Sequence, residues 1–120
     1  MALSETGLVQ VRTAGVVQAR MPELARRRVA SALRHIGEPV LFARVMLTMA
    51  ADPAVEQPAT AWAVVSVNGR PVRASGTGPT MPDAIGQLTA RLRIRLDRAW
   101  PDERGQLRRA AATRRAGHRR

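Results

Sequence analysis

The chain contains twenty basic residues, and every one of them is an arginine. Seven lie between Ala99 and Arg120, and three others, Arg20, Arg27 and Arg34, recur at seven-residue spacing. In a helix this spacing places the three side chains on one face. A guanidinium group is a planar, permanently charged fork that binds phosphate oxygens in a bidentate manner. The arrangement therefore predicts a nucleic acid as the partner.

The positive charge is a property of the body of the chain as well as of its end. The formal net charge is +11, and 13 arginines stand against 7 acidic residues up to Arg98. A folded domain that is itself basic indicates a defined binding surface, whereas a basic tail on a neutral domain would indicate only non-specific binding. The absence of lysine is also explained by a GC-rich genome, so the placement of the charges carries more weight than their identity as arginine.

Residues for catalysis or metal binding are scarce. With no cysteine, the chain has no disulfide, no thiolate nucleophile and no zinc finger. His35 and His118 are far apart, and neither has a carboxylate at metal-ligand spacing. We therefore expect no enzyme activity, no metal, no cofactor and no small-molecule substrate. Met1 to Gly15 lacks the apolar run of a signal peptide, and no stretch is apolar enough to span a membrane, so a cytoplasmic protein is expected.

The first half of the chain predicts a strand, a helix and a second strand. Leu8 to Ala14 alternates like a half-buried strand. Pro22 to Ile36 has a helical apolar period, with Gly37 as the expected carboxyl-terminal cap. Val40 to Ala50 predicts a strand whose core-facing residues are Leu41, Ala43, Val45, Leu47 and Met49.

The second half predicts a hairpin and a second helix. Strands from Thr60 to Val67 and from Arg70 to Ser75 flank Asn68-Gly69, the pair typical of a type I′ turn. Pro71 favours an edge position for the later strand, and Gly76-Thr77-Gly78 is expected to be a flexible connection. Thr80 and Asp83 have the spacing of a capping box, and Pro101 is expected to stop the helix. The apolar stripe of this helix is Met81, Ile85, Leu88, Leu92, Leu96 and Ala99.

These elements predict an α+β domain of β-α-β-β-β-α order over residues 1–101. A four-stranded sheet would carry both helices on one face, as in a double-stranded-RNA-binding-like fold, and leave its other face open. Residues 102–120 lack apolar periodicity, so a disordered arginine-rich tail or the start of a linker is expected.

Several segments together resemble the bacterial ribosome hibernation-promoting and ribosome-associated inhibitor family. These segments lie between Val9 and Trp100. The segment most specific to the family is a polar turn that leads into Asp83-Ala84-Ile85, followed by a basic helix with leucines at helical spacing. The end at Trp100-Pro101-Asp102 is similar to actinobacterial dormancy-associated members. The sequence departs from the family at Met81-Pro82, where an aromatic residue is common, and at Met21-Pro22, where a capping hydroxyl is usual. The residues after Pro101 could not form the ribosome-pairing domain of long members, so we expect either a short form or the amino-terminal part of a longer chain.

The resemblance implies a non-catalytic, monomeric RNA-binding protein that acts in stress and dormancy. It would bind 16S rRNA of the 30S small ribosomal subunit in the mRNA and tRNA channel, inhibit translation and protect idle ribosomes. The RNA-binding side chains carried over from the family are Arg20, Arg27, Arg28, Arg34, Arg91, Arg95 and Arg98. The tail would supply accessory contacts through Arg104, Arg108, Arg109, Arg114 and Arg115.

Two other functions use the same residues. A DNA-binding or nucleoid-associated regulator would use the same arginines, although no helix-turn-helix spacing is present. A protein-interaction module that modulates transcription would use the open face of the sheet. Trp62 and Trp100 are expected in core packing or helix capping, and one Phe with no Tyr argues against an aromatic platform for bases.

Overall fold

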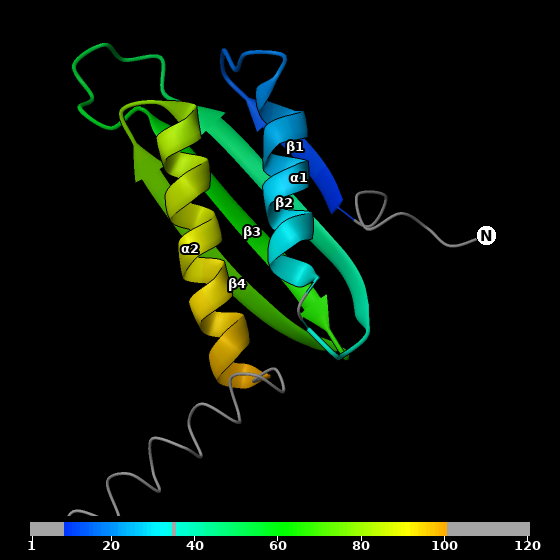
Figure 1. The fold of residues 1–120 in the computed structure, drawn as a ribbon. Coiled ribbons are helices and arrows are strands. Elements are labelled where there is room, and N and C mark those ends of the chain that lie inside the picture. The colour runs from blue at the N-terminus through cyan, green and yellow to red at the C-terminus, as the bar shows by residue number, and fades with distance from the viewer. Residues whose placement is uncertain (1–8, 35, 101–120) are drawn as a thin grey trace, which may run out of the picture.

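The computed structural model describes residues 9–34 and 36–100, which form one sheet covered by two helices. The elements in chain order are β1 (Val9–Ala14), α1 (Met21–Leu33), β2 (Val40–Met49), β3 (Ala59–Val67), β4 (Arg70–Gly78) and α2 (Met81–Ala99). The strands are ordered β1-β2-β3-β4; β1 is parallel to β2, and the other pairs are antiparallel. Figure 1 shows both helices on the same face, α1 over β1 and β2 and α2 over β3 and β4. The predicted α+β architecture is confirmed.

The hairpin between β3 and β4 forms at the predicted turn. Asn68 and Gly69 have φ angles of 53° and 79°, the positive values that a type I′ turn requires, and Val67 pairs with Arg70 across it. Pro71 lies in β4, an edge strand, as expected from its missing N–H.

Strand β4 is longer than the sequence predicts. Gly76, Thr77 and Gly78 belong to the strand and pair with β3, so the prediction of a flexible connection was wrong. A Cβ atom on Gly76 would lie 2.5 Å from the backbone nitrogen of Leu88, and one on Gly78 would lie 2.7 Å from Cβ of Asp83. The glycines are there because α2 lies directly on this part of the sheet.

Two boundaries in the first half differ from the prediction. Helix α1 ends at Leu33 and not at Ile36, and Gly37 does not have the positive φ of a helix cap. Pro39 disfavours a helical conformation at Glu38, so the helix has to end before that residue. In β2 the pairing with β3 shifts between Val40 and Phe42, and this irregularity leaves Leu41 exposed when it was expected in the core.

The amino terminus of α2 has the predicted cap. The side chain of Thr80 accepts a hydrogen bond from the N–H of Asp83 at 3.4 Å, and its hydroxyl donates to the Asp83 carboxylate at 2.7 Å. Of the predicted apolar stripe, Met81, Ile85 and three leucines are buried, while Ala99 at the last position is exposed.

Replacing the capping residue should weaken the fold measurably. The change Thr80→Ala leaves the N–H of Asp83 without its side-chain acceptor, so the free energy of unfolding should fall by about 1 kcal/mol. Denaturant unfolding followed by circular dichroism measures it. The control is Thr13→Ala, which removes an exposed threonine at the end of β1. Equal losses in the two variants would show that the cap contributes nothing of its own.

Candidate nucleic-acid interface

Three of the predicted arginines follow the outer face of α1. Arg20 and Arg34 flank the helix at its two ends, Arg27 lies in its middle, and all three side chains are exposed. The buried residues Met21, Ala25 and others lie on the opposite side of the helix, against the sheet. The seven-residue spacing therefore forms the predicted basic row.

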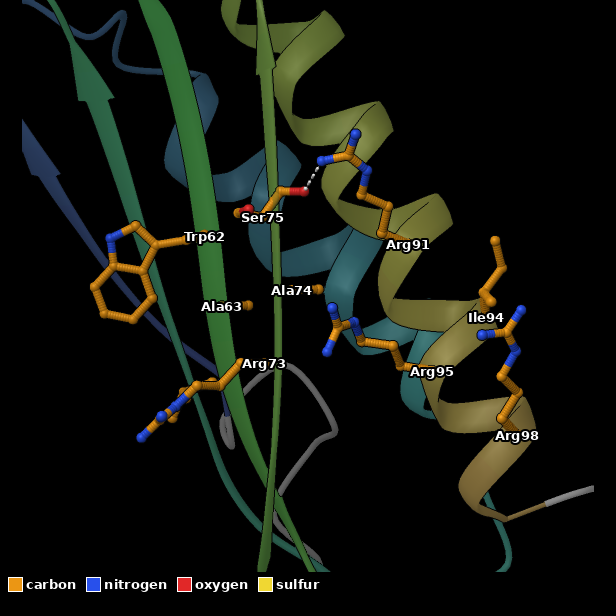
Figure 2. Close-up of a pocket in the computed structure, with 10 residues that line it drawn as sticks. Trp62, Ala63, Arg73, Ala74, Ser75, Arg91, Ile94, Arg95 and Arg98 are labelled. Carbon is orange, nitrogen blue, oxygen red and sulfur yellow. Dashed lines mark hydrogen bonds between the residues drawn. The ribbon is translucent and has the colours of Figure 1, made fainter.

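The second group of predicted arginines lies on the flank of α2 that faces the sheet edge. Arg91 donates a hydrogen bond from Nη1 to the backbone oxygen of Ser75 in β4, at 3.1 Å. Figure 2 shows Arg91, Arg95 and Arg98 projecting from α2 beside this edge strand. They line a groove of about 820 Å³, together with Ile94 of the same helix and residues of the hairpin. We call this the α2–β4 groove.

The hairpin supplies two basic residues that the sequence reasoning missed. Arg73 lines the α2–β4 groove, and Arg70 joins Arg73, Arg95 and Arg98 in a second depression that lies further along the edge strand. Arg70 also lies over the ring of Trp100, 5.7 Å from its centroid. The pairing of β4 with β3 is what brings these residues beside α2. A signal for them was present, because both arginines follow Asn68-Gly69 in a predicted edge strand.

The groove carries positive charge that nearby acidic residues do not neutralise. None of its ten lining residues is acidic. In the part of the chain that the structure describes, the single ion pair joins Arg26 to Glu23 on α1, at 2.7 Å. Arg73, Arg95 and Arg98 make no hydrogen bond or ion pair with any described residue. Like charges gathered in this way repel one another, and a polyanion would relieve that repulsion.

The predicted arginines form two separate surfaces. Arg93 reaches across from α2 to α1, where its Nη2 donates to the hydroxyl of Ser31 at 3.4 Å. The flank of α2 that carries Arg93 therefore faces α1, while Arg91 and its neighbours face the opposite way, toward β4. Arg28 is exposed and precedes Ser31 by three residues, so it lies on the flank of α1 that faces α2.

The two tryptophans have different environments. Trp100 is half-buried at the end of α2 and packs against the core, as expected. Trp62 is 42% exposed and lies on the open face of the sheet, so its predicted place in the core was wrong. Figure 2 shows its ring pointing away from α2. The alternation of β3 decides this, because Ala61 and Ala63 on either side of Trp62 are fully buried.

Other kinds of site find little support among residues 9–34 and 36–100. This part of the chain contains no cluster of His, Asp or Glu side chains that would hold a metal ion. Neither of its helices combines the length and the apolar character needed to cross a membrane. His35, His118 and the predicted tail contacts from Arg104 to Arg115 lie outside the described residues.

Solved structures with a similar fold include two bacterial proteins. The amino-terminal domain of Thermus thermophilus protein Y matches with a TM-score of 0.58 and 18% identity, over 74% of this chain and 97% of that one. The chain has the protein Y fold. A ribosomal subunit interface protein from Coxiella burnetii matches with a TM-score of 0.54 and 16% identity, over 76% of this chain and 94% of that one.

The protein Y fold confirms the family resemblance at the level of architecture. No family model matches the sequence, and no curated protein matches it at a significant level. At 16–18% identity the structural likeness establishes the fold alone. What the chain binds has to be argued from its arginines.

Proposed function

We propose that this protein is a ribosome hibernation factor. It binds 16S rRNA of the 30S small subunit in the mRNA and tRNA channel, inhibits translation and protects idle ribosomes. The protein acts in the cytoplasm, as a monomer and without catalysis. One of the structural neighbours described above is a ribosomal subunit interface protein, which supports a ribosomal partner. The rRNA contacts are made by the arginines of α1 and by those of the α2–β4 groove.

The observation that carries the proposal is the set of unpaired guanidinium groups in the α2–β4 groove. Arg73, Arg95 and Arg98 come from two elements, line one groove, and have no acidic neighbour among its lining residues. A groove of this kind offers bidentate contacts to phosphate groups on a folded RNA surface. The row of Arg20, Arg27 and Arg34 on α1 adds a second line of contacts at a fixed distance, because both helices are packed on one sheet.

Sedimentation of purified ribosomal subunits with the protein tests the proposal. The protein should travel with small subunits, and mRNA and tRNA should displace it. If about six phosphates are neutralised, affinity should fall on the order of a thousandfold between 50 and 200 mM salt. The experiment includes duplex DNA as a competitor. Failure of small subunits to retain the protein, with retention by bare duplex DNA, would overturn the proposal.

The same experiment addresses the two other functions. A nucleoid-associated regulator would prefer duplex DNA, but neither helix is arranged to enter a major groove as part of a helix-turn-helix. A protein-interaction module would hold a protein partner in lysate treated with nuclease. No specific contact in the described part of the chain favours either of these functions over RNA.

A further inference from the structure

The face of the sheet that the helices leave open is itself basic. None of the four strands contains Asp or Glu, and Arg12, Arg44 and Arg73 are exposed on this face. The strand register places Arg44 opposite Val64 and Val64 opposite Arg73, so two guanidinium groups flank one apolar side chain on three neighbouring strands.

Aromatic rings lie on the same face. Trp62 occupies the next position along β3 on this face, about 7 Å from Val64, and pairs with Met46 on β2 and Ser75 on β4. Phe42 pairs with Ser66, two residues beyond Val64 in the other direction. The guanidinium group of Arg44 lies over the Phe42 ring, 4.9 Å from its centroid. Two aromatic residues and a guanidinium group that lies over one of the rings therefore share one surface, which we call the open-face platform.

We propose that the open-face platform binds unpaired RNA. Bases would stack on Trp62 and on the guanidinium plane over Phe42, and phosphates would contact Arg12, Arg44 and Arg73. The platform shares Trp62 and Arg73 with the α2–β4 groove and adds Arg12, Arg44 and Phe42, which do not line that groove. Its ligand, unpaired RNA, differs from the folded rRNA proposed for the groove, and the inference does not require the proposed function. The four-stranded sheet of the RNA recognition motif stacks bases on exposed aromatic residues. The composition argued against such a platform, but the strand register brings Trp62 and Phe42 to the same face.

Charge and the arrangement of the side chains favour RNA over two other occupants, a second copy of the chain and an anionic lipid surface. A second copy of the chain would bring Arg12, Arg44 and Arg73 against the same arginines, which repel. An anionic lipid surface would need a continuous patch of apolar side chains that insert into it, whereas the Phe42 ring lies under the Arg44 guanidinium and Trp62 lies beside Ser75. The platform also carries the hydroxyl group of Ser75 at its β4 edge, which suits hydrogen bonds to base edges and to ribose. The hydroxyl of Thr77 further along the edge donates to Oε1 of Gln57 at 2.8 Å.

Tryptophan fluorescence tests the inference directly. Trp62 and Trp100 are the two tryptophans, so the variant Trp100→Phe reports on Trp62 alone and keeps a ring for Arg70. A short single-stranded oligoadenylate RNA should quench this signal on binding. Inorganic polyphosphate, which has charge but no bases, should quench it little at saturation. Three results would overturn the inference. Polyphosphate could quench the signal as much as RNA does, or the matching DNA oligomer could bind more tightly than RNA. The third is a blue shift with anionic phosphatidylglycerol vesicles and no binding of RNA.

Substitution of the ring gives the expected size of the effect. Followed by anisotropy of labelled RNA, Trp62→Ala should weaken oligoadenylate binding roughly tenfold to a hundredfold, the range for loss of one stacked base. Trp62→Phe should recover most of it. If Trp62→Ala does not fold, Arg12→Gln with Arg44→Gln, neither of which lines the α2–β4 groove, should lower the salt slope by about two. The matched charge control is Ala51→Glu with Ala54→Glu in the loop between β2 and β3. Unchanged affinity in the platform variants would refute the platform, and this readout is independent of whether ribosomes retain the protein.

Discussion

Replacing Arg95 and Arg98 with glutamine should reduce affinity for the small ribosomal subunit by about a hundredfold near physiological salt. Each side chain lines the α2–β4 groove, and neither makes a hydrogen bond or ion pair with a described residue. Loss of one charged contact costs about 1.5 kcal/mol, which corresponds to roughly a tenfold change in affinity. The slope of log affinity against log salt should fall by about two units, because two fewer phosphates are neutralised.

The control keeps the same change in net charge but moves it away from the groove. Ala51→Glu with Ala54→Glu lowers the net charge by the same amount, in exposed positions of the loop between β2 and β3. Figure 1 shows that loop at the end of the sheet opposite the carboxyl end of α2, where Arg95 and Arg98 lie. Equal losses of affinity in the two variants would mean that total charge, and not the groove, determines binding. Circular dichroism of both variants checks that each has folded.

Replacing Gly76 with alanine should destabilise the protein by about 3 kcal/mol or more. The added Cβ would lie 2.5 Å from the backbone nitrogen of Leu88 and would also overlap the backbone oxygen of Ala84. Both atoms belong to the backbone of α2, so no side chain can turn away, and the helix must move off the sheet. Thermal and denaturant unfolding measure the loss. Because α2 carries Arg91, Arg95 and Arg98, the same variant should also bind subunits more weakly.

Gly86→Ala provides the matched control for this prediction. Gly86 lies in α2 as well, but a Cβ added there has no heavy atom within 4 Å. Alanine is the better helix former, so this change should stabilise the protein by roughly 0.5–1 kcal/mol. A similar response of the two glycines would show that the close approach of α2 to β4 does not limit stability.

Local patterns in the sequence predicted most of the architecture because they depend on neighbours in the chain. The Asn68-Gly69 turn and the Thr80-Asp83 cap both formed as expected, since each is satisfied within four residues. Gly76 and Gly78 were misassigned for the opposite reason. Their composition is typical of a loop, and only the approach of α2, from further along the chain, explains glycine within a strand.

The candidate site also has one part that local spacing predicted and another part that depends on tertiary packing. Seven-residue spacing along α1 was enough to place Arg20, Arg27 and Arg34 on one exposed face, because a helix fixes that relation by itself. Spacing along α2 likewise grouped Arg91, Arg95 and Arg98. It did not show that this group turns away from α1 and meets Arg70 and Arg73, since that depends on how the helix packs against β4.

The sequence by itself therefore determined the order of the elements, the basic character of the chain and the helical rows of arginine, all of which follow from composition and local periodicity. The tertiary structure alone decided which arginines meet in the α2–β4 groove. It also placed Trp62, Phe42 and three arginines together on the open face. The physical reason is that sheet register and the packing of helix on strand join residues far apart in the chain, and periodicity within a single element contains no information about its neighbours.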